Sequence, residues 1–337
     1  MLFLFLVPYL LTLGQSELPK FAPSPDKVKV DLDMPLEGRK YKNGTGFSLN
    51  PKLLGAMPKK VALVSFYSFD PGMTKIQRWR SKRDDYYFTY TTQHTKVTKR
   101  NAVGGSGELA LGYYLQSVDA LIDGFSEYGV DLLLPEEFLD TDEKTEFYNN
   151  FVVERGKLNE WLANMGSGNH DVIFGYPEGY NVLDVVNEPY GNYTSTGGQF
   201  LTKKGDIADK QVWVMDKCGP MVESLGDKLC HGLGVDAVVI VYFTIFSPKD
   251  DKVTLENVNM HMFGPNPTPL PEGQEKKFNY FTGKFYVGTR VTAGITIWQK
   301  NKKNPDPELE FEGFDNIMKA MTVEMCTYLK EGIEKGQ

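Results

Sequence analysis

The 337-residue chain has little cysteine and little histidine. Its three cysteines, Cys218, Cys230 and Cys326, are too few for a disulfide-rich framework. If residues 216–233 form one helix, Cys218 and Cys230 lie about 18 Å apart, which excludes a bond between them. A bond from either of them to Cys326 stays open. The four histidines show no paired spacing, so we expect no metal site and no cofactor.

The chain also lacks an excess of basic residues, since its formal charge is −7. Domains that bind nucleic acid usually carry a basic patch, so we expect no nucleic-acid partner. The candidate for a local patch is the cluster Lys96, Lys99 and Arg100, which is more typical of a solvated strand end.

Long hydrophobic runs are missing except at the amino terminus, where Leu2–Leu13 is nearly unbroken apolar. About a dozen apolar residues are too few to span a bilayer as a helix but match the apolar part of a secretory signal. Cleavage near Gly14 or Gln15 would fit the small residues there, although no Lys or Arg precedes the run. We therefore predict a signal peptide over 1–15 and a secreted or periplasmic location. The alternative is a buried amino-terminal strand or helix.

The rest of the chain divides by composition into a leader and a body. Residues 16–58 contain six prolines among many charges and show no sustained period, which predicts an extended leader. We expect 59–337 to form a single large α/β domain with insertions near 68–103 and 175–215. The first insertion contains a basic stretch at 75–85, followed by an aromatic, strand-like run.

Two segments repeat one pattern, in which a helix ends in Gly-Val-Asp and leads into a short apolar run. In the first, the helix covers 107–128 and the strand 130–134; in the second, they cover 221–233 and 235–243. The first helix carries apolar residues at helical spacing, which we expect to form its buried face. These residues are Leu111, Leu115, Val118, Ile122 and Phe125. The repeat predicts parallel strands that are joined by crossover helices.

The carboxyl-terminal part has a different pattern. Residues 253–263 and 285–298 alternate in polarity over long runs, which predicts an antiparallel hairpin. A final amphipathic helix is expected over 314–332. Together these patterns predict an α/β fold: a mixed sheet with crossover helices, extended by a long antiparallel hairpin. Association of the 285–298 hairpin with a membrane remains a lesser alternative.

Further elements are expected from shorter patterns. Compact β-rich runs predict strands at 61–67, 171–175 and 182–186. The stretch 135–162 reads as a second, irregular helical region that Pro135 would begin.

A glycine-rich stretch is the first candidate site. Gly104, Gly105, Ser106 and Gly107 precede the first helix, where backbone N–H groups can hold an anion, and Arg100 is the nearest supporting charge. The spacing matches neither common nucleotide-binding pattern. A flexible turn before the helix is the alternative interpretation.

The second candidate is Glu188 in the sequence Asn187-Glu188-Pro189. Asn-Glu-Pro at a strand end resembles the acid/base motif of retaining glycosidases. That chemistry needs a second carboxylate roughly 5 Å away, and no second glutamate stands in such a context. We expect no catalytic residue and keep Glu188 as the alternative.

The order of elements resembles that of the small periplasmic α/β domain found at the amino terminus of the TolB family and in the curli secretion channel family. The resemblance rests on the strand 61–67, the helix ending in Gly129, the Pro-Glu-Glu after the second strand, the run Leu233–Val241 and the long hairpin. It implies a non-enzymatic domain that docks partners or forms rings in the cell envelope. This chain departs from the pattern in its large insertions and in lacking a lipid-anchor cysteine.

These observations favour a secreted or periplasmic, non-catalytic binding or assembly component of the cell envelope. We expect a protein partner or self-assembly. The alternative is a glycoside hydrolase that uses Glu188 as its acid/base residue.

Overall fold

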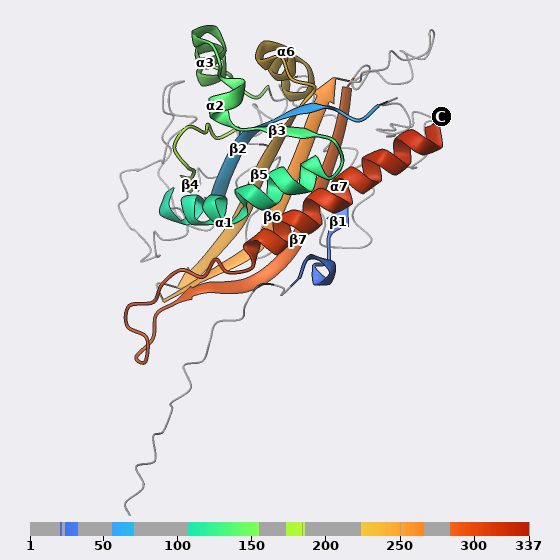
Figure 1. The fold of residues 1–337 in the computed structure, drawn as a ribbon. Coiled ribbons are helices and arrows are strands. Elements are labelled where there is room, and N and C mark those ends of the chain that lie inside the picture. Colours follow the sequence, from blue (N-terminus) through green and yellow to red (C-terminus); the bar gives the residue numbers. More distant parts are fainter. Residues whose placement is uncertain are drawn as a thin grey trace, which may run out of the picture.

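The computed structural model describes a mixed seven-stranded sheet with helices on both faces (Figure 1). The described residues are 21, 24–32, 56–70, 107–154, 173–183, 185, 224–249, 251–265 and 284–336. The strands are β1 (Asp31–Leu32), β2 (Lys60–Asp70), β3 (Asp131–Leu133), β4 (Ile173–Gly175), β5 (Ala237–Lys249), β6 (Lys252–Pro265) and β7 (Lys284–Gln299). The helices are η1 (Pro25–Lys27), α1 (Gly107–Ser126), α2 (Pro135–Phe138), α3 (Asp142–Asn149), η5 (Ser224–Leu229), α6 (Cys230–Leu233) and α7 (Phe314–Gly336). The predicted α/β class is thereby confirmed.

The centre of the sheet is parallel. Strand β2 pairs in parallel with β3 on one side and with β5 on the other. Both neighbours follow a glycine in the left-handed conformation, Gly129 and Gly234, each with φ of 70°. A side chain with a Cβ is strained at that φ, so glycine suits both helix ends. The two Gly-Val-Asp units therefore deliver the chain into one sheet, as the repeat predicts.

The other half of the sheet is antiparallel. Strand β5 pairs with β6, and β6 pairs with β7 over most of its length. The full strand order is β1-β7-β6-β5-β2-β3, and β4 pairs with the far end of β2. The predicted hairpin is confirmed, with Phe285, Val287 and Val291 buried on one face of β7.

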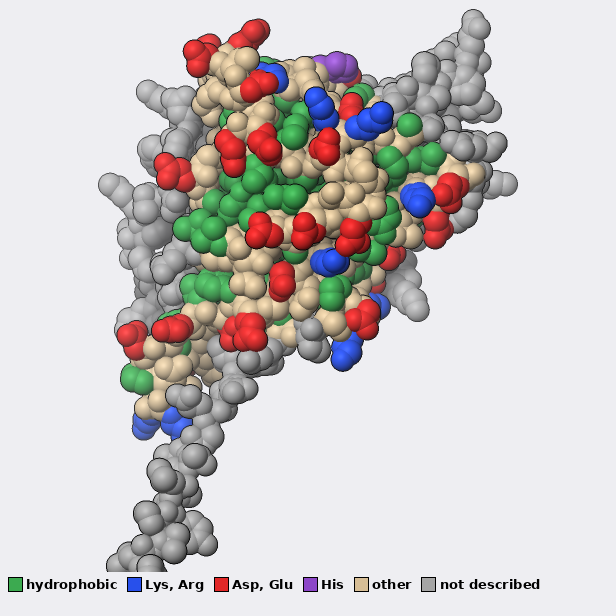
Figure 2. All heavy atoms as spheres, in the orientation of Figure 1, with side chains coloured by type: hydrophobic (Ala, Val, Ile, Leu, Met, Phe, Trp, Pro, Cys, Tyr) green, Lys and Arg blue, Asp and Glu red, His purple; other side chains and the backbone are tan. Residues whose placement is uncertain are grey.

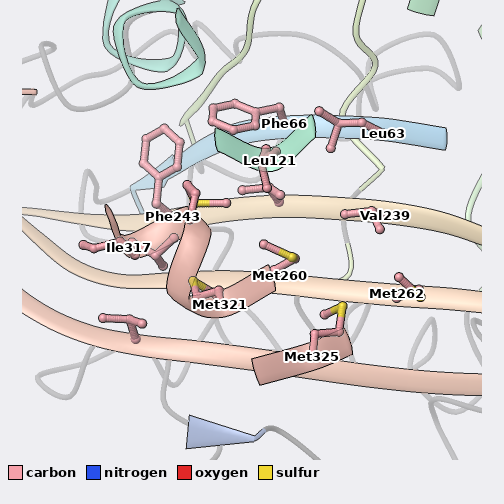
Figure 3. Packing of buried hydrophobic residues seen from close by; sticks show 14 of the residues in the cluster. Leu63, Phe66, Leu121, Val239, Phe243, Met260, Met262, Ile317, Met321 and Met325 are labelled. Carbon is pink, nitrogen blue, oxygen red and sulfur yellow. The ribbon is translucent and has the colours of Figure 1, made fainter. Parts of the chain in front are cut away.

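The larger core lies between the sheet and the pair α1 and α7, which cross one face of the sheet (Figure 1). Methionines from β6 and α7 meet there below Phe243 and Leu121 (Figure 3). The helices also touch directly, because Gly124 on α1 leaves room for Thr322 on α7. The amino-terminal Phe21 joins this core, edge-on to Tyr113 and Phe314.

A second core lies on the opposite face, beneath α2, α3, η5 and α6. Here one sequence prediction is wrong, because residues 181–183 and 185 form no strand. Their backbone groups are bonded by side chains of β2 instead. Ser65 Oγ donates to the Asn181 carbonyl at 2.6 Å and accepts from the Leu183 N–H at 3.0 Å, while Tyr67 OH accepts from the Val185 N–H at 3.4 Å.

Tyr148 of α3 completes this arrangement. The register between β2 and β5 shifts between Leu63 and Ser65, so Val64 has no partner in β5. The Tyr148 hydroxyl donates to the Val64 carbonyl at 2.6 Å and accepts from the Asn181 N–H at 2.9 Å. Apolar residues are thus buried here without strand pairing. A sequence pattern alone does not distinguish such a segment from a buried strand.

The described cysteines are both buried and free. Cys230 belongs to the second core and Cys326 to the first, on opposite faces of the sheet. Burial raises the pKa of the Cys326 thiol to about 12, so it stays protonated at neutral pH. Among the described helices, none combines the length and the apolar run that crossing a membrane requires.

Candidate functional site

The exposed face of α1 carries the candidate site. Leu115 is 65 % exposed and Leu111 is 43 % exposed, while Val118 and Ile122 are half-buried beside them. These four residues are spaced i, i+4, i+7 and i+11, so they form one continuous line along the helix. We call them the α1 stripe. From Leu111 to Ile122 the stripe is about 16 Å long, at 1.5 Å per residue.

The stripe corrects a sequence prediction, which assigned Leu111 and Leu115 to the buried face of the helix. Of the predicted set, Phe125 lies in the core and Ile122 packs partly against it, but Leu111 and Leu115 are exposed. Most of the buried face is made by other residues at helical spacing, namely Ala110, Tyr113, Ser117, Leu121 and Gly124. Ser117 can be buried because its hydroxyl donates to the Tyr113 carbonyl at 2.7 Å. The helix is therefore apolar on two sides, and α7 and the sheet cover one of them.

Acidic side chains border the stripe. Asp119 and Asp123 lie on the exposed surface of α1, and Glu136 is exposed on α2. Figure 2 shows hydrophobic side chains gathered over α1, with acidic side chains beside them. Among the described residues, Asp119 and Glu136 form no ion pair with a Lys or Arg. Acidic groups of α1 and α2 therefore lie beside the stripe.

A tyrosine pair closes one edge of the stripe. Tyr114 packs edge-on against Phe66, and Tyr180 OH donates to Tyr114 OH at 3.3 Å. Burial raises the pKa of the Tyr114 phenol, and the carboxylates of Glu136 and Asp119 raise it further, against a lowering by the bond from Tyr180. Both carboxylates are thus close enough to Tyr114 to act on it. This edge is neutral and carries acidic groups nearby.

The residues that the sequence nominated fall mostly outside the described part of the chain. Gly107 is the first residue of α1, as expected of a glycine-rich stretch that precedes a helix. Gly104, Gly105, Ser106 and Arg100 lie outside the described residues, and so does Glu188. The anion site and the acid/base role therefore stay predictions.

A second polar group occurs on the sheet face opposite α1, at the middle of β5 and β6. Thr244, Asn257, Asn259 and His261 are all buried there, and His261 stacks on Tyr242 with 5.5 Å between ring centroids. Burial lowers the pKa of His261 to about 3, so the imidazole is neutral at physiological pH. These side chains belong to the interior, and we assign no open site to them.

The sequence Met260-His261-Met262 combines thioether and imidazole groups, which suit copper, but alternation along β6 separates them. The two methionines lie in the core beneath α7, whereas His261 points to the other face, as alternation along a strand requires. Among the described residues, no group of three His, Cys, Asp or Glu is placed to hold a metal ion.

Comparison with protein-family models, with curated proteins and with solved structures finds no match to this chain.

One sequence signal could have revealed the stripe. Residues 109–125 contain more apolar side chains than a single face holds, since Leu109, Ala110, Tyr113 and Leu121 lie across the helix from Leu111 and Leu115. A helix that is apolar on two sides either packs against two partners or is itself buried on all sides. The choice of which side meets the sheet depends on packing with α7, which is distant in sequence.

Proposed function

We propose that this chain is a non-catalytic binding or assembly component of the cell envelope, periplasmic or secreted, that docks a protein partner on the α1 stripe. The observation that carries the proposal is the exposure of Leu115 and Leu111 in line with two half-buried apolar residues. Single exposed apolar residues are ordinary on protein surfaces, but a contiguous line rimmed by polar groups is typical of an interaction site. The apolar amino-terminal run supports the location.

The geometry suits a partner that lays an elongated apolar surface along α1. Side chains at i, i+4, i+7 and i+11 match the anchors that an amphipathic segment presents to a groove. Tyr114 limits the stripe on one edge, and the carboxylates of Asp119 and Asp123 limit it on the other. Leu115 is the most exposed of the four, so it offers the largest area for a partner to cover.

The test is a single substitution with a matched control. Leu115→Lys places a good helix former on the surface and adds an i,i+4 pairing with Asp119, so the fold should be unchanged. Val152→Lys makes the same change at another exposed apolar residue, 38 % exposed and outside α1. We expect the unsubstituted chain and Val152→Lys to capture the same protein from an envelope extract, or to self-associate, and Leu115→Lys to do neither.

Equal capture and self-association by all three proteins would contradict the proposal. Circular dichroism and thermal unfolding of each variant show whether a loss of binding reflects a loss of folding.

The rival function, glycoside hydrolysis through Glu188, has a separate test. An enzyme of that kind hydrolyses aryl glycosides, and Glu188→Gln removes its acid/base carboxyl and abolishes turnover. We expect no turnover by either protein. Hydrolysis that disappears in Glu188→Gln would replace the binding proposal with the enzymatic one.

A further inference from the structure

We infer that the partner of the α1 stripe is an amphipathic helix that carries basic residues along both edges of its apolar face. The inference rests on the proposed function, because it names the kind of partner that the same surface binds. It follows from two properties of that surface, which are the aliphatic side chains along its centre and the carboxylates along its edges (Figure 2).

The centre of the stripe favours a helical partner over an extended one. Its four side chains are aliphatic, two leucines, a valine and an isoleucine, so they offer no hydrogen-bond donor or acceptor. An extended segment laid on them would bury backbone N–H and C=O groups without partners, which costs free energy. A helix bonds its own backbone groups and presents only side chains. Its rows of side chains also fit between rows at the three- and four-residue spacing of the stripe.

The edges of the stripe favour basic residues on that partner. Asp119 and Asp123 are exposed along one edge, and α1 contains no Lys or Arg. Tyr114 forms the other edge, and Glu136 of α2 is exposed and close enough to interact with it electrostatically. The charge of Asp123 is partly balanced by Lys319 of α7, whereas Asp119 and Glu136 form no ion pair among the described residues. A helix with basic residues beside its apolar face thus meets a carboxylate on each side.

The same carboxylates disfavour a second copy of α1 as the occupant. Two copies that met stripe against stripe would place acidic edges together, whether the helices ran parallel or antiparallel, because Asp119 lies at one edge and Glu136 near the other. Like charges across an interface are repulsive. A partner of opposite charge replaces that repulsion with attraction.

Designed peptides provide the probe. Two of them are helices of about 14 residues, long enough to cover the stripe, with leucines at i, i+4, i+7 and i+11. One carries Lys at the positions beside the leucines, and the other carries Glu there. A third is the Lys peptide with a proline at its centre, which prevents a continuous helix. Fluorescence anisotropy measures binding of each labelled peptide to the full chain, in about 50 mM and about 500 mM salt.

The apolar contact is tested at Leu115. Leu115→Gln removes the most exposed side chain of the stripe without adding charge, and Val152→Gln makes the same kind of change at another exposed apolar residue. We expect the Lys peptide to bind the unsubstituted chain and Val152→Gln equally, and to bind Leu115→Gln at least about tenfold more weakly. The peptide with the proline should bind none of them measurably, because its leucines no longer form one line.

The charge is tested with one carboxylate at each edge. Asp119→Asn combined with Glu136→Gln leaves the stripe intact, and Asp306→Asn combined with Glu308→Gln is the matched control at two exposed residues of the loop after β7. On the unsubstituted chain, we expect the Lys peptide to bind at least about tenfold more tightly than the Glu peptide at the lower salt, with a smaller ratio at the higher salt. The first double variant should reduce the ratio at the lower salt to about threefold or less, and the control should keep it.

Four results overturn the inference. The Lys and Glu peptides bind the unsubstituted chain equally, the peptide with the proline binds as tightly as the Lys peptide, Leu115→Gln binds the Lys peptide as the unsubstituted chain does, or the double variant at the edges keeps the full ratio. If no peptide binds but Leu115→Lys abolishes capture or self-association, the proposed function stands and the chemistry of the partner is wrong. If Leu115→Lys changes neither, both fail.

Discussion

Replacing Tyr148 by Phe removes one hydroxyl and leaves one buried and one partly buried backbone group without their bond to it. The hydroxyl donates to the Val64 carbonyl at 2.6 Å and accepts from the Asn181 N–H at 2.9 Å, and Tyr148 is only 1 % exposed. Val64 lies at the register shift of β2, where β5 offers it no partner. A buried polar group that loses its partner costs about 1–3 kcal/mol. The partly buried Asn181 N–H costs less than the buried Val64 carbonyl, so we expect Tyr148→Phe to lower the free energy of unfolding by about 2–4 kcal/mol in total.

The assay is urea denaturation followed by fluorescence, with Tyr128→Phe as the matched control. The Tyr128 hydroxyl shares a single, partly buried bond of 2.8 Å with Thr327 Oγ1, so its loss should cost about 0.5–1.5 kcal/mol. Hydrogen exchange adds a local readout, since the Asn181 amide should exchange faster in Tyr148→Phe and unchanged in Tyr128→Phe.

A double-mutant cycle sharpens this prediction. Ser65 Oγ holds the same segment through the Asn181 carbonyl and the Leu183 N–H. Ser65→Ala and Tyr148→Phe should therefore be non-additive, because either one releases residues that the other also holds. Equal effects of Tyr148→Phe and Tyr128→Phe, or strict additivity with Ser65→Ala, would refute the reasoning that side chains of β2 and α3 replace strand pairing here.

Three further predictions concern packing, pH and processing. A Cβ on Gly264 would lie 2.7 Å from the Asp236 carbonyl oxygen and against the Phe285 ring, so Gly264→Ala should cost about 1–3 kcal/mol in chemical denaturation. Gly129→Ala meets no atom within 4 Å and should cost only the strain of its φ of 70°, about 1 kcal/mol. Folding holds the pKa of His261 at about 3, whereas the unfolded chain protonates its histidines near pH 6.5. The free energy of unfolding should therefore fall as pH drops from 6.5 toward 3, by up to about 1.4 kcal/mol per pH unit. His261→Gln should reduce that dependence when unfolding is measured in urea at pH 7, 5 and 4. Amino-terminal sequencing of secreted protein should show cleavage next to Gly14; an uncleaved chain would contradict the signal-peptide assignment.

The sequence predicts the central sheet because its signals there are local. Gly129 and Gly234 mark two helix ends, and the apolar runs behind them are too short for helices. Strict alternation likewise predicts the hairpin of β6 and β7, since a face of period two is visible in any strand that is half buried.

Two errors share one physical cause, which is that burial depends on partners distant in sequence. Leu115 and Leu121 have equal apolar character, but only Leu121 lies on the side that the sheet and α7 cover. Val182 and Leu183 are buried, as residues of a strand would be, but a side chain takes the place of a paired strand. Ser65 Oγ of β2 bonds to the Asn181 carbonyl and to the Leu183 N–H. The hydrophobic pattern of a sequence shows which residues are apolar. It does not show which neighbour covers each of them.

The central claim, that the α1 stripe is covered by a partner, has a direct test by thiol labelling. Leu115→Cys is compared with Val152→Cys in a chain whose Cys218 is replaced by Ser, so that the other two cysteines, Cys230 and Cys326, are buried. Maleimide labelling is timed in dilute purified protein and in the assembled or envelope-extract state. We predict that Leu115→Cys reacts quickly when dilute and at least tenfold more slowly when assembled, while Val152→Cys reacts equally in both. Equal labelling of Leu115→Cys in the two states would contradict the claim.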